Sequence, residues 1–211
     1  IDGAVVGTAE VDEDGAWSLP TTEELAEGDH TVDATQTDAA GNTSAADSTT
    51  FTIDATAPEA PVITEPLDGT ITDDATPTIA GTAEPGTTVD VTISGPDGSS
   101  VVLEGVPVGD DGTWSVTPTE PLSDGEQTIT ATATDEAGNT SAPSAPVTIT
   151  VDTAAPEAPV ITSPADGSVT SDRTPAISGT AEAGTTVDVS ITDAGGSTIN
   201  IREVPVIDAN G

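Results

Sequence analysis

Short runs of β-branched and aliphatic residues, each bounded by Gly, Pro, Asp or Asn, follow one another along the whole chain. Several runs alternate apolar and polar positions with a period of two, which places every second side chain on one face of a strand. The inward faces predicted in this way are Val89, Val91 and Ile93 in one run and Ile129, Ala131 and Ala133 in another. No run shows the period of an amphipathic helix. The pattern predicts an all-β protein.

Between Asp54 and Val151 the pattern predicts seven short strands joined by turns. They cover residues 61–64, 76–83, 87–94, 99–108, 113–118, 127–135 and 145–151. Prolines before the first strand confine it to a sheet edge, and Leu67–Ala75 is expected to be a turn. This number of strands in about 97 residues indicates a two-sheet β-sandwich of the immunoglobulin kind, with a barrel as the alternative.

The chain repeats itself at a spacing of about 98 residues. FTIDATAPEAPVIT from Phe51 returns as ITVDTAAPEAPVIT from Ile149, and TDAAGNTSA from Thr37 returns as TDEAGNTSA from Thr134. A period of this length is one small domain, so the chain is a stretch of a tandem array. The predicted domains are the later part of one repeat (residues 1–53), a complete repeat (54–151) and the earlier part of a third (152–211), arranged end to end.

The predicted core is built from Val, Ile, Ala and Leu, with one tryptophan per repeat, Trp17 or Trp114. Each tryptophan follows a turn and is expected to anchor the core rather than to stack on a ligand. Because so few aromatic residues are present, we expect a thin core that gains from an added clip.

Acidic residues dominate the charge, with 38 Asp and Glu against 2 Lys and Arg and a net charge of -36. This balance excludes nucleic acid and anionic lipid as partners, and no run is long and apolar enough for insertion into a membrane. No cysteine is present, so disulfides and zinc-thiolate sites are excluded. Rigidity must come from packing or from metal.

The acidic residues recur at fixed points of the repeat. When the strands are traced through a sandwich, alternate loops return to the pole where the chain enters, here named the incoming pole. The residues assigned to it are Asp54, Glu84, Asp110, Asp111, Asp135, Glu136 and Asn139 in the complete repeat, Asp12, Glu13, Asp14, Asp38 and Asn42 in the first copy, and Asp152, Glu182, Asp208 and Asn210 in the third. The opposite, outgoing pole receives Asp68, Asp73, Asp74, Asp97 and Asp124.

Carboxylates from distant loops are thus predicted to meet where successive domains join. Several carboxylates at close range do not all stay ionised without a cation, and oxygen ligands in flexible loops suit Ca²⁺ better than Mg²⁺. The alternative is that Asp, Asn and Gly are simply the residues that turns use. The predicted calcium ligands are Asp12, Asp14, Asp38, Asp54, Glu84, Asp110, Asp111, Asp135, Asp152, Glu182 and Asp208.

Four motifs together carry a family resemblance: D-x-[TA]-A-P-x-A-P-V-I-T, G-T-A-E-x-G-[ST]-T-V, D-x-x-G-x-W and A-T-x-T-D-x-A-G-N-T-S. The chain resembles the bacterial Ig-like repeats of very large surface adhesins of the repeats-in-toxin and biofilm-associated kind. The resemblance implies an extracellular extender on the bacterial surface, stiffened by calcium at its linkers, that holds a ligand-binding tip away from the cell. It also implies that Asp54 with Asp135 supply calcium ligands, as does Asp152 with a loop outside the 211 residues. One departure is Gly109, which stands where the first copy has Asp12.

Catalysis is disfavoured. His30 is the sole histidine, aligns with Gln127, and is expected to be a surface strand residue rather than a base. The leading hypothesis is a calcium-stiffened spacer whose partners are neighbouring repeats of the same chain. The alternatives are a ligand-binding Ig-like module, or an array that associates with other adhesin chains in a matrix fibre.

Overall fold

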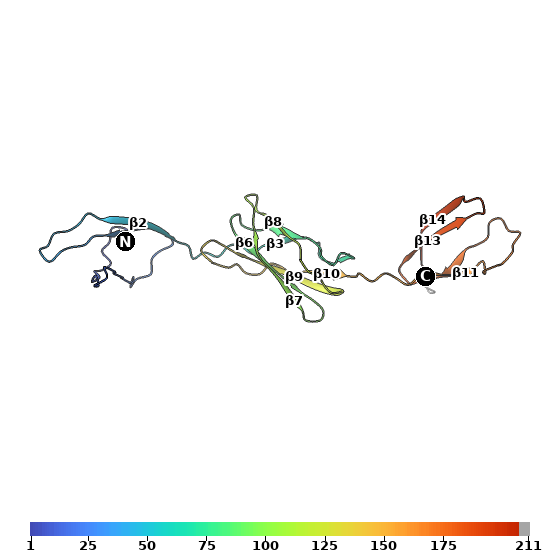
Figure 1. Cartoon of the computed structure of the whole chain (residues 1–211), viewed down its shortest axis with the longest axis horizontal. Helices are drawn as coiled ribbons and strands as arrows, with labels where there is room; N and C mark the ends of the chain where they lie inside the picture. Colours follow the sequence, from blue (N-terminus) through green and yellow to red (C-terminus); the bar gives the residue numbers. More distant parts are fainter. Residues whose placement is uncertain (207–211) are drawn as a thin grey trace. The chain divides into compact units, whose positions relative to one another are not determined.

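The computed structural model describes residues 1–206, which form β-strands and loops without a helix (Figure 1). None of these residues belongs to a helix that could cross a membrane. The chain divides into two compact units, Ile1–Asp152 and a second that begins at Thr153. The all-β class predicted from the alternating pattern is confirmed.

The complete repeat is a sandwich of two sheets, and the barrel alternative is wrong. Its strands are β3 (Val62–Glu65), β4 (Thr70–Thr72), β5 (Ile79–Thr82), β6 (Thr88–Ser94), β7 (Ser100–Pro107), β8 (Thr113–Val116), β9 (Gly125–Thr134) and β10 (Val147–Val151). The five-stranded sheet has the order β4-β10-β9-β6-β7, and the three-stranded sheet has the order β3-β5-β8.

Strand direction fixes where the loops lie. β3 pairs antiparallel with β5, β5 with β8, β6 with both β7 and β9, and β9 with β10. Alternate loops therefore return to the same end of the sandwich, which is the end that carries the incoming linker at Asp54. The two poles deduced from the sequence follow from this pairing.

The segment between β3 and β5 was expected to be a turn, and this expectation is wrong for β4. Three residues are too few to show a period, and Ile71 points its side chain into solvent with 75% of it exposed. β4 exists because Thr70, Ile71 and Thr72 lie parallel to Ile149, Thr150 and Val151 of β10. The predicted edge position of β3, by contrast, is confirmed.

The core lies between the two sheets of the complete repeat and contains the inward faces predicted from the sequence. Val89, Val91, Ile93, Ile129, Ala131 and Ala133 are all buried there. Trp114 is 3% exposed and packs on Gly81, its register partner in β5. A Cβ at Gly81 would overlap the carbonyl oxygen of Val62 and lie 2.6 Å from Cζ2 of Trp114, so glycine is required for this approach.

A β-bulge interrupts the pairing of β6 with β7 next to Gly105. The Asp90 carboxylate accepts a hydrogen bond from the Gly105 N–H at 2.7 Å, and Gly105 has a φ of 68°. The third copy repeats the bulge with Asp188 and Glu203 at 2.8 Å, although Glu203 carries a side chain at a φ of 56°. The bulge therefore recurs in the repeat whether or not a glycine occupies this position.

The two ends of the chain hold fewer strands. In the N-terminal fragment, β1 (Gly28–Ala34) pairs antiparallel with β2 (Asp47–Ile53). In the C-terminal fragment, β11 (Val160–Ser163) pairs with β12 (Ser178–Thr180), and β13 (Thr186–Thr192) pairs with β14 (Thr198–Pro205). Every buried hydrophobic residue of the described chain lies in the complete repeat.

Candidate metal centre at the incoming pole

The loop between β9 and β10 is closed by Asp135 and Asn139. Asp135 Oδ1 accepts from the Asn139 backbone N–H at 2.8 Å, and Oδ2 accepts from the Asn139 side-chain Nδ2 at 2.9 Å. The backbone N–H of Asp135 in turn donates to the Asn139 carbonyl at 3.1 Å. The TDEAGNTS sequence forms this loop because Gly138 supplies the positive φ, 92°, that the turn requires.

The same asparagine ties the loop to the incoming linker. Asn139 Nδ2 also donates to the backbone carbonyl of Asp54 at 3.0 Å, across 85 residues of sequence. The Asp54 side chain accepts from the Thr56 N–H at 3.1 Å, which turns the linker at this point. Asp54, Asp135 and Asn139, three residues that the sequence assigned to one pole, are thus brought together.

The first copy builds the same loop. Asp38 Oδ1 accepts from the Asn42 N–H at 2.8 Å and Oδ2 from Asn42 Nδ2 at 2.8 Å, while Thr37 bridges to Thr43 as Thr134 does to Thr140. The loop closure is therefore encoded locally, and only the Asn139 bond to Asp54 depends on a linker.

Hydrogen bonds control the protonation of these carboxyls. The Asn139 side chain lowers the pKa of Asp135 below its usual value near 3.8, and Asn42 lowers the pKa of Asp38 in the same way. Both groups stay ionised at neutral pH and leave lone pairs for a further donor or a cation.

Two further loops of this pole lie side by side. The Ala83 N–H, next to Glu84, donates to the Gly112 carbonyl at 2.9 Å, next to Asp111. The Asp111 carboxylate, however, accepts from the Thr113 hydroxyl at 2.7 Å and from its N–H at 3.0 Å, which lowers its pKa. Glu84 and Asp110 are exposed. These acidic residues belong to turns, as expected if Asp is simply a residue that turns use, and they do not form one cluster with Asp135.

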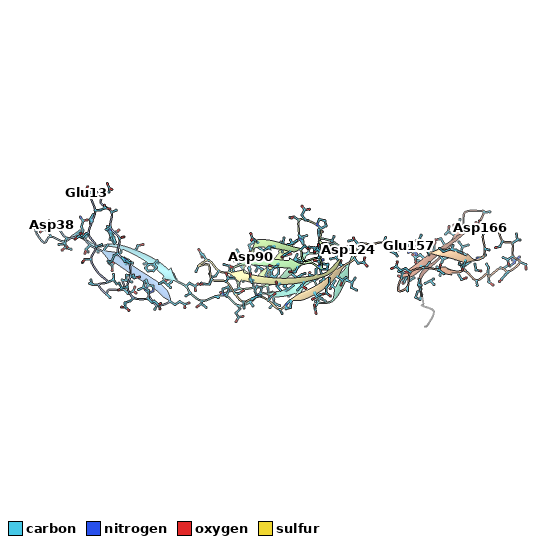
Figure 2. The ribbon with its side chains drawn as sticks, turned by 90° about the horizontal axis from the view of Figure 1, so that it is seen from below. Glu13, Asp38, Asp90, Asp124, Glu157 and Asp166 are labelled. Carbon is cyan, nitrogen blue, oxygen red and sulfur yellow. The ribbon has the colours of Figure 1, made fainter. Side chains whose placement is uncertain are left out.

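The remaining predicted ligands are distributed over the fragments. Asp12 Oδ1 caps its own turn by accepting from Asp14 and Ala16 N–H groups at 3.0 and 2.8 Å. Glu13 of this turn and Asp38 lie at the same end of the N-terminal fragment (Figure 2). Asp152 donates from its backbone to Thr72 at 2.9 Å, and Glu182 accepts from Thr185 through its carbonyl. Asp208 and Asn210 lie outside the described residues.

At the outgoing pole the acids also serve the backbone. Asp68 Oδ1 accepts from the Thr148 N–H of β10 at 2.8 Å, and Asp97 accepts from Ser99 in the turn after β6 at 2.9 Å. Asp124 lies at this end of the complete repeat (Figure 2). The assignment of Asp68 to this pole is wrong, because its partner Thr148 is opposite Thr128 and three residues before Val151, so Asp68 lies along the edge of the sheet. Sequence reasoning did not find this hydrogen bond, because it depends on the pairing of β4 with β10.

Among residues 1–206, no three carboxylate or histidine side chains lie close enough together to hold a metal ion. The groups that do converge are the Asp135 carboxylate, the side-chain amide of Asn139 and the backbone carbonyl of Asp54. These hard oxygen donors fit Ca²⁺ in kind. They fall short of its usual six to eight ligands, so waters or a neighbouring repeat would have to supply the remainder.

His30 was expected on the surface, and this expectation is wrong, because only 6% of it is exposed. Its Nδ1 lies 2.6 Å from Asp2 Oδ2 and its Nε2 lies 2.7 Å from the Ala26 carbonyl oxygen. Gln127 occupies the same place in the complete repeat and donates from Nε2 to the Ser123 carbonyl at 2.7 Å. The alignment of His30 with Gln127 could have indicated this burial, because both side chains form a hydrogen bond with the backbone carbonyl four residues earlier.

A shallow groove of about 330 Å³ recurs in the two copies that contain its residues. In the complete repeat it is lined by Glu59, Ala60, Val62, Thr82, Ala83 and Glu84. The equivalent residues line the groove of the third copy, from Glu157 to Glu182. A groove common to the repeats is a property of the domain shape, which does not distinguish one copy as a binding module.

Comparison with known proteins agrees with the predicted family. Residues 1–55 and 66–153 match the family described as "Bacterial Ig-like domain". The chain belongs to this family. The resemblance found in the motifs and the immunoglobulin-like fold are both confirmed. No curated protein matches the chain.

The chain is also similar to two solved structures. One is described as the crystal structure of a tetra-tandem repeat in the extending region of a large adhesion protein, with 29% identity and a TM-score of 0.41. The match covers 93% of this chain and 50% of that one, so this chain spans about half the length of that structure. The other is CopC from Methylosinus trichosporium OB3b, with 14% identity, a TM-score of 0.34, and coverage of 44% and 93% respectively.

Proposed function

We propose that this chain is a stretch of structural extender repeats from a large bacterial cell-surface adhesin, with calcium bound where a linker meets the incoming pole. The role is extracellular and non-enzymatic, and it serves adhesion or biofilm formation by projecting a ligand-binding region. Its partners are the neighbouring Ig-like repeats of the same chain. The adhesin repeats that share 29% identity come from an extending region, and assigning that role to this chain is part of the proposal.

The observation that carries the proposal is the bond from Asn139 Nδ2 to the Asp54 carbonyl. It couples the linker to a loop whose two carboxylate oxygens are already oriented by Asn139. A cation shared by Asp54 and Asp135 strengthens this coupling, because it bridges two like charges that otherwise repel. A linker tied to this loop at Asp54 bends less, and this is the property that an extender needs.

The experiment compares the full chain in calcium and in chelator, by thermal unfolding and small-angle X-ray scattering. Calcium is expected to raise the unfolding midpoint and to narrow the distribution of distances between repeats. Asp135→Asn keeps one of the two acceptor oxygens in the loop but removes the charge, and it is expected to weaken calcium binding by about tenfold or more. Glu126→Ala, an exposed acidic residue on β9, is the matched control.

Equal calcium titrations for Asp135→Asn and Glu126→Ala would remove Asp135 from the site. Identical scattering with calcium and with chelator would contradict the stiffening itself. An extender without calcium would still be supported if the linker proved rigid in both conditions.

A further inference from the structure

The two linkers of the complete repeat are connected through one pair of strands. The incoming linker at Asp54 leads through β3 into β4, and β10 runs directly into the outgoing linker. β4 and β10 lie side by side and parallel, in a register that runs from Ile149↔Thr70 to Val151↔Thr72. The shortest path between the chain that enters the sandwich and the chain that leaves it therefore crosses this strand pair alone.

The parallel order decides how the pair responds to tension along the chain. Both strands run from the incoming pole toward the outgoing pole. Tension pulls β4 backward by its N-terminal end and β10 forward by its C-terminal end, so the two strands are made to slide past each other. Because the bonds between parallel strands are evenly spaced, they carry this load together. In an antiparallel pair pulled apart from one end, the bonds break one after another.

Further hydrogen bonds lengthen the pair at both ends. At its start, the Gly69 N–H donates to the Thr148 carbonyl at 2.8 Å, and the Thr148 N–H donates to Asp68 Oδ1 at 2.8 Å. At its end, the Asp152 N–H donates to the Thr72 carbonyl at 2.9 Å. The Asp68 carboxylate thus takes the place that a backbone carbonyl would have in a longer β4.

β3 comes before β4 on the path of the tension. Its pairing with β5 joins Val62 to Thr82 and Ile63 to Gly81, and the register then shifts before Glu65. When this pairing is lost, the tension passes to β4. The next bonds to resist it are those between β4 and β10.

β10 belongs to the core, whereas β4 lies at its margin. Val147, Ile149 and Val151 are at most 9% exposed, but Ile71 is 75% exposed. The connection of β4 to β10 therefore depends on backbone hydrogen bonds and on Asp68 more than on apolar burial. A change at Asp68 is expected to affect resistance to tension more than the stability of the sandwich at rest.

We propose that the β4–β10 pair, with Asp68 as one of its acceptors, is the element that resists unfolding when the chain is pulled along its length. The inference goes beyond the extender role, because it assigns the mechanical strength of a repeat to one strand pair inside the sandwich. The pair needs no calcium at the linker, so its test is made in chelator. Its failure would leave the proposed calcium joint unaffected, and a failure of that joint would leave the strand pair unaffected.

The test holds the full chain by its two ends at constant force, in chelator, and measures the lifetime of the complete repeat. The opening of this repeat is recognised by a gain in length of at most about 340 Å, the extended length of about 98 residues. Asp68→Ala removes the acceptor of the Thr148 N–H and is expected to shorten the lifetime about fivefold, which corresponds to one hydrogen bond of about 1 kcal/mol. Asp68→Asn keeps a carbonyl oxygen and should restore most of the lifetime.

Asp97→Ala is the matched control. Asp97 is also an exposed carboxylate that accepts from a backbone N–H, that of Ser99 at 2.9 Å, but it lies in the turn after β6. In urea without load, Asp68→Ala and Asp97→Ala should lower stability by similar amounts, because each removes one exposed hydrogen bond. Under tension only Asp68→Ala should shorten the lifetime.

The direction of pulling supplies a second readout. No cysteine is present, so Asp97→Cys and Asp124→Cys together introduce two unique points of attachment. The turns that carry them are adjacent, since a Cβ at Gly125 would lie 2.9 Å from Cγ of Pro96. Pulling these points apart separates β6 from β9 bond by bond. The repeat should therefore open at a lower force, and Asp68→Ala should have no effect in this direction.

Equal lifetimes for the unmodified chain and Asp68→Ala under tension along the chain, with the repeat folded by circular dichroism, would overturn the inference. Equal effects of Asp68→Ala in the two pulling directions would overturn it as well, because the bond would then act on stability in general. A shorter lifetime along the chain alone, restored by Asp68→Asn, is the result that supports it.

Discussion

Trp114 and Trp17 follow the same turn motif in two copies of one repeat, yet the first is 3% exposed and the second 55%. The difference extends to every core position, because all the buried hydrophobic residues described belong to the complete repeat. Similar local sequence therefore does not by itself produce a core. A core forms where both sheets of the sandwich are present, since each inward face needs the other to exclude water.

The largest expected effect is the difference in the loss of stability when one or the other tryptophan is replaced. Trp114→Ala should lower the free energy of unfolding of the complete repeat by about 3–5 kcal/mol, because it opens a cavity between the sheets. Trp17→Ala should change the free energy of unfolding of the complete repeat by about 0.5 kcal/mol or less, because Trp17 is exposed and lies outside that repeat. Urea unfolding followed by circular dichroism measures both. Similar losses for the two variants would show that Trp17 contributes to the stability of the complete repeat.

A smaller effect is expected at the loop that both copies share. Asn139→Ala removes side-chain bonds to Asp135 and to the linker carbonyl of Asp54, and should cost the complete repeat about 1–2 kcal/mol. Asn42→Ala makes the same change in the N-terminal fragment and should leave the unfolding of the complete repeat unaltered. Trp114 fluorescence in a Trp17→Phe background isolates the relevant transition. If Asn139→Ala is as neutral as Asn42→Ala, the linker bond contributes nothing to stability.

The bulge offers a comparison between the complete repeat and the C-terminal fragment. Gly105 has a φ of 68°, so Gly105→Ala should destabilise the complete repeat by about 1 kcal/mol. Glu203 already bears a side chain at a φ of 56°, and Glu203→Gly should slow hydrogen exchange in the β13–β14 hairpin by relieving that conformation. Chemical denaturation and amide exchange measure the two effects. Faster exchange in Glu203→Gly would mean that the Glu203 side chain stabilises the hairpin.

The smallest effect is the pH response that separates His30 from Gln127. Hydrogen bonds to the Ala26 carbonyl and to Asp2 raise the pKa of His30 above its usual value of 6.5. A raised pKa means that the stabilisation is fully present below 6.5 and is lost as the pH rises through the folded-state value. NMR titration of the ring protons should place the midpoint above 6.5, and His30→Gln should abolish the dependence. A midpoint at or below 6.5 would show that burial outweighs both hydrogen bonds.

Much of the candidate site could be read from the sequence, and the reason is local. The Asp135–Asn139 loop and its copy at Asp38–Asn42 close through bonds that span four residues, so the recurring motif is enough to predict them. Whether Asp111 and Glu84 join Asp135 in one centre depends on how the three loops that carry them pack against each other. The Asp111 carboxylate accepts from Thr113, two residues later, instead.

The sequence by itself determined the all-β class and the inward faces of β6 and β9, because a strand shows its period of two within a few residues. It also determined the edge position of β3 and the two poles, because the antiparallel order of strands assigns each loop to one end of the sandwich. The tertiary structure alone decided on β4, which exists only beside β10, and on the burial of His30 against Asp2 and Ala26. The deciding partners, β10 for β4 and Asp2 for His30, lie far away in the sequence, so a local pattern does not indicate them.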